Sequence, residues 1–116
     1  GEFTVHRLGP SAPLPVVVAE DPFCWVGRTD DELSIVCRSS LAVDSLSRES
    51  GWSCLEVQGP LDFALTGVLA GIATVLADAG VSILALSTFE TDYILVKREG
   101  LRDAVSALRE AGYSIG

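Results

Sequence analysis

The feature that most constrains how this chain can fold is a change of hydrophobic period in its second half. Residues 53–58 alternate between apolar and polar side chains, as the residues of a half-buried strand do. In residues 65–79 the apolar side chains recur instead at steps of three and four, and Gly80 follows where a helix would end. Together the two patterns predict a strand followed by a helix of about four turns.

A hairpin and a second helix complete the pattern. Residues 81–87 and 93–97 are rich in β-forming side chains and enclose a polar tip, which predicts an antiparallel hairpin. Residues 101–111 carry one apolar face and end at Gly112, which predicts the second helix, and residues 113–115 are a candidate last strand. This order is the α+β, ferredoxin-like pattern βαββαβ, in which two helices cover one face of an antiparallel sheet.

Composition places the chain among small globular proteins. Its 116 residues are 48% hydrophobic and 21% charged, which is enough apolar side chain for one compact unit or two very small ones. Sixteen acidic residues against eight basic ones give a net charge of -8, which argues against a nucleic acid or an anionic membrane as a partner. No apolar stretch reaches the roughly 18 residues of a membrane span and no signal-peptide pattern opens the chain, so we expect a cytoplasmic protein.

The number and spacing of the cysteines bear on the redox compartment of the protein and on metal binding. Cys24, Cys37 and Cys54 are odd in number and widely spaced, which favours reduced core thiols in a reducing compartment. No pair has the spacing of metal ligands, and we expect neither a metal site nor a cofactor. The chain opens Gly1-Glu2-Phe3, and whether these residues are a cloning remnant is left open.

The first half reads as a copy of the same plan. Residues 4–8 alternate as a strand does and stop at Gly9-Pro10, as the later strand stops at Gly59-Pro60. A shift of sixty residues then aligns residues 30–38 with residues 90–98. The match predicts an internal repeat, although similar pairs in short β-rich windows also arise by chance.

The first copy differs from the second in its helices. Three prolines between residues 11 and 22 leave room for one or two helical turns at most. Residues 23–28 and 33–38 are expected to form a hairpin, and residues 39–50 a loop or a short helix before the next strand.

Three stretches of the second half resemble a known family. They are residues 52–60, residues 65–70 and residues 86–96, the last of which contains the run Ser87-Thr88-Phe89-Glu90-Thr91-Asp92-Tyr93. These stretches resemble the small bacterial ACT-domain proteins, which are related to the ACT modules of aspartate kinases and of CASTOR-type arginine sensors. The resemblance implies a degenerate ACT-like half at residues 1–50, a complete ACT domain at residues 51–116, an amino acid bound at an interface between such units, and dimerisation.

The resemblance also implies where a ligand would bind, between the loop before the first helix and the tip of the hairpin. The loop departs from the family's simpler Asp-x-Pro-Gly turn, because residues 59–67 read Gly-Pro-Leu-Asp-Phe-Ala-Leu-Thr-Gly. The implied ligand-binding residues are Leu61, Asp62, Phe63, Leu65, Thr66, Gly67, Thr88, Phe89 and Asp92.

The residue types in these two loops suit a zwitterionic amino acid. Free backbone amides at the start of a helix attract a carboxylate, and Gly67 lets a ligand approach the backbone closely. Asp62 or Asp92 can accept hydrogen bonds from the ammonium group, with Thr88 as a neutral partner. Phe89 can wall the pocket against the ligand's side chain.

Each of these residues also has a structural interpretation. Asp62 and Thr66 are of the types that cap helices, and the tip at residues 88–92 can be a solvated turn whose Phe89 docks on a partner. For the other polar or aromatic candidates we expect structural roles: His6 in a strand, Trp25 and Trp52 in the core or an interface, and Asp30, Asp31 and Glu32 in a turn, with Ca2+ binding at that turn left open.

We expect a non-catalytic regulatory protein that binds an amino acid or a related small effector. A single histidine without a nearby nucleophile gives no triad, and nothing selects a substrate for an acid–base pair of Asp62 and Asp92, so no catalytic residue is assigned. A homodimer is expected because residues 83–86 are apolar on both faces of their strand, and a regulated enzyme or another protein is a further candidate partner. The alternative is an ACT-like interaction or dimerisation module without a ligand.

Overall fold

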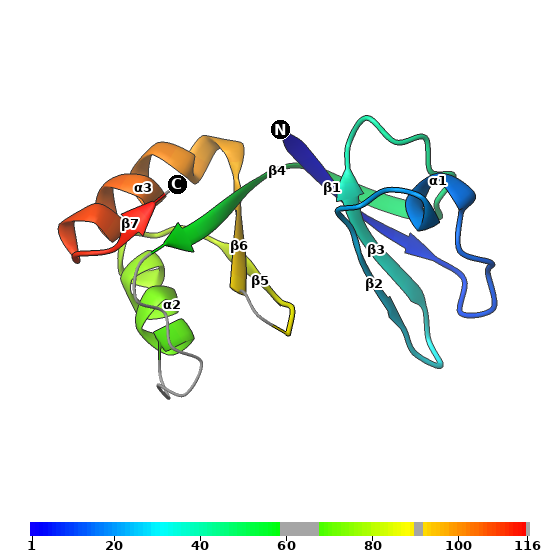
Figure 1. The fold of residues 1–116 in the computed structure, drawn as a ribbon, viewed down its shortest axis with the longest axis horizontal. Helices are drawn as coiled ribbons and strands as arrows, with labels where there is room; N and C mark the ends of the chain where they lie inside the picture. Colours follow the sequence, from blue (N-terminus) through cyan, green and yellow to red (C-terminus); the bar gives the residue numbers. More distant parts are fainter. Residues whose placement is uncertain (59–67, 90–91, 116) are drawn as a thin grey trace. The chain divides into compact units, whose positions relative to one another are not determined.

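The chain folds into two compact units, which a computed structural model describes for residues 1–58, 68–89 and 92–115 (Figure 1). The first unit is Gly1–Trp52 and the second is Ser53–Gly116. From the sequence, the boundary between the two units was expected after residue 50. Among the described residues, no helix has the length and hydrophobicity that crossing a bilayer would require.

The second unit contains the predicted strand, helix, hairpin and helix, and a short last strand. Within it the strands lie in the order β7-β4-β6-β5, which is the order of a ferredoxin-like sheet. The predicted helix of residues 65–79 is described only from Val68 onwards. The elements are β4 (Ser47–Gln58), α2 (Val68–Asp78), β5 (Ile83–Ser87), β6 (Asp92–Lys97), a single 3-10 turn (Arg98–Gly100), α3 (Leu101–Glu110) and β7 (Ser114–Ile115).

The core of the second unit lies between its two helices and one face of its sheet. Apolar side chains from α2 and α3 pack against Leu55 of β4 and against alternate residues of β6, as the two hydrophobic periods require. Leu95 lies between two members of this core in sequence and is also fully buried, so β6 is buried on both faces. The buried members of the cluster are Leu55, Ile72, Leu76, Ile94, Val96, Ala104 and Leu108.

Both long helices end at the glycines that the sequence marks. Gly80 has a φ of 74°, its N–H donates to the carbonyl of Ala77 at 3.0 Å, and the N–H of Val81 donates to the carbonyl of Leu76 at 2.9 Å. Gly112, with a φ of 95°, ends α3 in the same way. This pair of hydrogen bonds is a Schellman motif, which needs a left-handed residue and therefore favours glycine.

The first unit has the same strand order, with one short helix where the second unit has two longer ones. Its strands lie in the order β2-β3-β1-β4, so the first part of β4 takes the place that β7 has in the second unit. A single turn of helix lies between its first two strands, as the prolines predict, and residues 39–46 form turns and loop where the second unit has its second helix. The elements are β1 (Glu2–Leu8), α1 (Val16–Ala19), β2 (Trp25–Arg28) and β3 (Leu33–Arg38), followed by β4.

One prediction for the first unit needs correction. Residues 47–50 were expected in a loop or a short helix, but they belong to β4, which is continuous from Ser47 to Gln58. The backbone of this segment pairs with β1, an interaction that does not depend on apolar side chains. Glu2 and Phe3 are part of β1, and Phe3 is only 7% exposed.

Candidate functional site

The β5–β6 hairpin carries the three described residues of the implied ligand site. Ser87 and Asp92 are its last paired residues, and the Ser87 hydroxyl donates to Oδ1 of Asp92 at 2.5 Å. Thr88 and Phe89 follow in the tip, where Thr88 is exposed and the Phe89 side chain is 97% exposed. In the described part of the hairpin, the Asp92 carboxylate is therefore held next to Ser87 and the Phe89 ring is exposed to solvent.

The other six implied ligand-binding residues lie outside the described part of the chain. They belong to residues 59–67, which connect β4 to α2, so the predicted carboxylate site at the start of this helix stays a prediction. They are Leu61, Asp62, Phe63, Leu65, Thr66 and Gly67.

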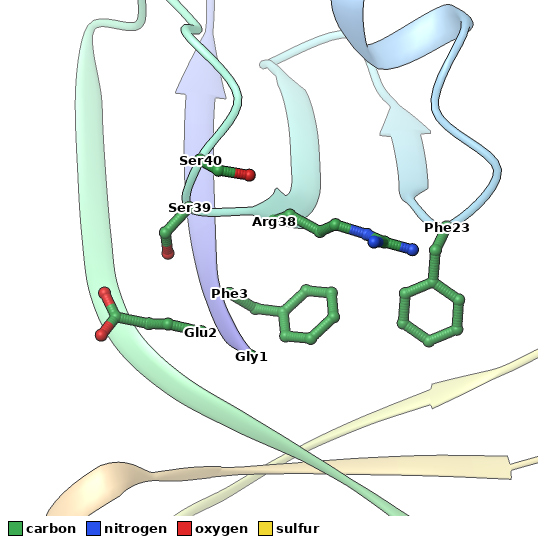
Figure 2. Close-up of a pocket in the computed structure, with 7 residues that line it drawn as sticks. All are labelled: Gly1, Glu2, Phe3, Phe23, Arg38, Ser39 and Ser40. Atoms are coloured by element: carbon green, nitrogen blue, oxygen red, sulfur yellow. The ribbon is translucent and has the colours of Figure 1, made fainter.

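A cavity of about 570 Å³ lies in the first unit, where the sequence analysis assigned no site (Figure 2). Three separate segments build it, and the pairing of β1 with β3 places Phe3 opposite Arg38. Figure 2 shows the Arg38 side chain extending towards Phe23, with the Phe3 ring beside it. The lining residues are Gly1, Glu2, Phe3, Phe23, Arg38, Ser39 and Ser40.

The cavity combines aromatic walls with one guanidinium group. The Phe3 and Phe23 rings are 5.4 Å apart between centroids, and the Arg38 guanidinium carbon lies 5.8 Å from the centroid of Phe23. Nε of Arg38 is 3.6 Å from Oδ1 of Asp21, which fixes this edge of the guanidinium. Such a site suits a small molecule with an apolar body and an anionic group.

The remaining candidates have structural environments. His6 is 2% exposed, its Nδ1 is 2.9 Å from the Ser45 hydroxyl, and burial, with a smaller effect from Arg48, lowers its pKa. Trp25 packs edge-on against Phe23 at 4.8 Å between centroids, and Trp52 is buried.

The acidic turn at Asp30, Asp31 and Glu32 is organised by its neighbour Thr29. The Thr29 hydroxyl accepts hydrogen bonds from the N–H groups of Asp31 and Glu32, at 3.2 and 3.3 Å. Glu32 also forms an ion pair with Arg7 at 3.7 Å. Within the described ranges, no three histidine, cysteine or acidic residues gather in a way that could hold a metal ion.

Solved structures similar to this chain include those of two bacterial proteins. The first is the X-ray structure of a protein from Agobacterium tumefaciens, which is 35% identical over 97% of this chain and 84% of its own, with a TM-score of 0.86. The second is a protein of unknown function from Vibrio cholerae, described as a possible transport protein, which is 23% identical over 95% of this chain and 83% of its own, with a TM-score of 0.74. The second likeness shows a common fold alone.

Sequence comparison identifies the family. No curated protein matches the chain. A family model described as an N-terminal domain matches residues 1–42. The model of the ACT domain matches residues 47–110, which is more than half of the chain and spans the second unit from β4 to the end of α3. The chain therefore belongs to the ACT-domain family.

Proposed function

We propose that this protein is a cytoplasmic, non-catalytic regulator that binds an amino acid or a related small effector. ACT domains are regulatory modules, and the match to this family is the observation that carries the proposal. The ligand is held at an interface between ACT units and contacts the β5–β6 hairpin at Thr88, Phe89 and Asp92.

The environment of Asp92 supports its role as the acceptor for the ammonium group. Its Oδ1 already accepts the Ser87 hydroxyl, which limits the rotation of the carboxylate at the mouth of the hairpin. A carboxylate has more than one lone pair per oxygen, so it can accept from a ligand ammonium while it keeps this bond. A free amino acid has few atoms, and micromolar affinity, about -8 kcal/mol, requires that most of its polar groups find partners.

The strand orders support the proposal that two ACT-like units make up the chain. In each unit the first and third strands are neighbours, the second strand lies outside the third, and the fourth lies outside the first. A degenerate ACT-like unit at residues 1–50 would have this order. Among the described strands β5 is an end strand, and its Leu84 and Leu86 are half-buried, which supports the proposed homodimer.

A thermal-shift panel of the standard amino acids at millimolar concentration tests the proposal. A ligand present at 100 times its dissociation constant adds about 2.7 kcal/mol to the free energy of unfolding. For a chain of this size we therefore expect the Tm to rise by several degrees with a selective ligand. Asp92→Asn, which keeps the shape of the side chain and removes its charge, should abolish the shift.

Arg38→Gln is the matched control, because it alters the first-unit cavity and leaves the hairpin unchanged. A shift that survives Asp92→Asn and disappears in Arg38→Gln would place the ligand in the cavity and refute the hairpin site. A flat panel on folded protein would contradict amino-acid binding.

A protein-interaction module without a ligand is the second candidate. The specific observation in its favour is Phe89, whose nearly complete exposure at a hairpin tip is unusual for a large apolar side chain. In that case Phe89→Ser should lower the mass measured by light scattering, while Asp92→Asn should leave it unchanged.

A further inference from the structure

Cys24 and Cys37 flank the β2–β3 hairpin, whose register brings them opposite each other. The register pairs Trp25, the first residue of β2, with Val36, and extending this register by one residue places Cys24 opposite Cys37. Residues that face each other across an antiparallel pair project to the same side of the sheet. The hairpin register therefore directs both thiols to one face.

The hydrogen-bond pattern defines how close this pair is. The N–H of Thr29 donates to the carbonyl of Glu32 at 2.9 Å, so positions 29 and 32 form a hydrogen-bonded pair. Hydrogen-bonded and non-hydrogen-bonded pairs alternate along the register, which makes the Cys24–Cys37 pair a non-hydrogen-bonded one. The Cα atoms of such pairs are about 4.5 Å apart, at the short end of the range of about 4.4 to 6.8 Å that disulfides span.

Burial agrees with the register. Cys37 is fully buried in the core cluster that contains Leu33 and Ile35, and Cys24 packs, half-buried, against the same cluster. The Cys24 thiol is directed to the carbonyl of Val18 at 3.5 Å. Cys54, the third cysteine, belongs to the second unit and serves as an internal reference.

We propose that Cys24 and Cys37 form a redox-active dithiol site that closes to a disulfide within the first unit when it meets a low-molecular-weight disulfide such as oxidised glutathione. Because Phe23 precedes Cys24 and Arg38 follows Cys37, the new bond would lie next to two walls of the first-unit cavity.

The two thiols have different roles in the reaction. The Cys24 thiolate, which is the more accessible, attacks one sulfur of oxidised glutathione, the S–S bond breaks, and one glutathione thiolate leaves. The Cys37 thiolate then attacks the Cys24 sulfur of this mixed disulfide and expels the second glutathione thiolate. The protein loses two electrons and two protons, and oxidised glutathione becomes two molecules of the reduced thiol.

The second step is expected to be the slower one. Burial raises the pKa of the Cys37 thiol, and the neighbouring Cys24 and Asp21 raise it further, so little thiolate is present at neutral pH. The rate of closure should therefore increase as the pH rises.

Tryptic mapping of the full chain tests the proposal. The folded protein is treated with oxidised glutathione, free thiols are blocked with N-ethylmaleimide, and the chain is then unfolded and digested. Cleavage after Arg7, Arg28, Arg38, Arg48 and Lys97 puts each cysteine in its own peptide, at residues 8–28, 29–38 and 49–97. We expect the first two peptides to be joined, with Cys54→Ser giving the same result.

Single variants distinguish the two thiols. Cys37→Ser should trap glutathione on Cys24, whereas Cys24→Ser should leave Cys37 unmodified, and circular dichroism checks that each variant is folded. A mixed disulfide that persists on Cys24 of the unaltered chain at high pH would overturn the proposal. So would a link that forms only after the chain has been unfolded, or one that joins peptide 8–28 mainly to peptide 49–97.

Discussion

Replacing Ile94 by valine removes one methylene from the core of the second unit, and replacing Ile35 by valine removes one from the core of the first. The two sites are closely matched, because both side chains are fully buried and both lie in strands. They belong to separate core clusters that share no buried residue. A buried Ile→Val change costs about 0.5 to 1.5 kcal/mol, and a urea m-value near 1 kcal/mol/M converts this to a lower midpoint by about 1 M.

The chain contains a separate optical probe for each unit. Both tryptophans, Trp25 and Trp52, lie in the first unit, whereas the two long helices, α2 and α3, lie in the second. We expect Ile94→Val to lower the urea midpoint seen by far-UV circular dichroism and to leave the tryptophan fluorescence midpoint nearly unchanged. Ile35→Val should do the reverse. If either substitution moves both midpoints equally, the chain unfolds as one cooperative unit and the inference from separate cores is refuted.

Two further predictions concern pH and backbone conformation. Burial, with a smaller effect from Arg48, lowers the folded-state pKa of His6 below 6.5, so protonation favours the unfolded chain and stability should fall as the pH drops from about 6.5 towards that lower pKa. His6→Asn, which keeps a partner for Ser45, should flatten this part of a plot of urea midpoint against pH; an unchanged acid slope would contradict the assignment. Gly80→Ala should lower the free energy of unfolding by about 1 kcal/mol, because the backbone φ at Gly80 is 74°. Gly9→Ala is its control and should have little effect on the Tm, because Gly9 has no positive φ and no atom lies within 4 Å of an added Cβ.

The sequence predicts the elements of the second unit well because several local signals agree there. Period-two and helical patterns, β-forming runs and two glycine stops all point to the same order, and the glycines have the left-handed conformation that their role requires. The prediction fails at residues 47–50, where the polar run Ser-Arg-Glu-Ser resembles a loop. This part of β4 is the end strand of the first unit, and its pairing with β1 depends on backbone groups that a hydrophobic pattern does not report.

The candidate sites depend on register, which a hydrophobic pattern does not give. The first-unit cavity joins Phe3, Phe23 and Arg38, and only the pairing of β1 with β3 brings Phe3 opposite Arg38. The cysteine pair, by contrast, depends on the register of one hairpin alone. The expected hairpin around residues 29–32 already fixes which residues face each other, and counting outward from this turn reaches Cys24 and Cys37.

The strand β4 explains how so short a chain holds two units with the same strand order. Two separate ferredoxin-like sheets need eight strands, whereas the described residues form seven. The chain achieves this because β4 is the last strand of the first unit over its first half and the first strand of the second unit over its remainder (Figure 1). A strand with both roles has to be long, and β4, at 12 residues, is about twice the usual length. Its polar first half suits the end of one sheet, and its alternating second half, with Leu55 in the core, suits the interior of the other.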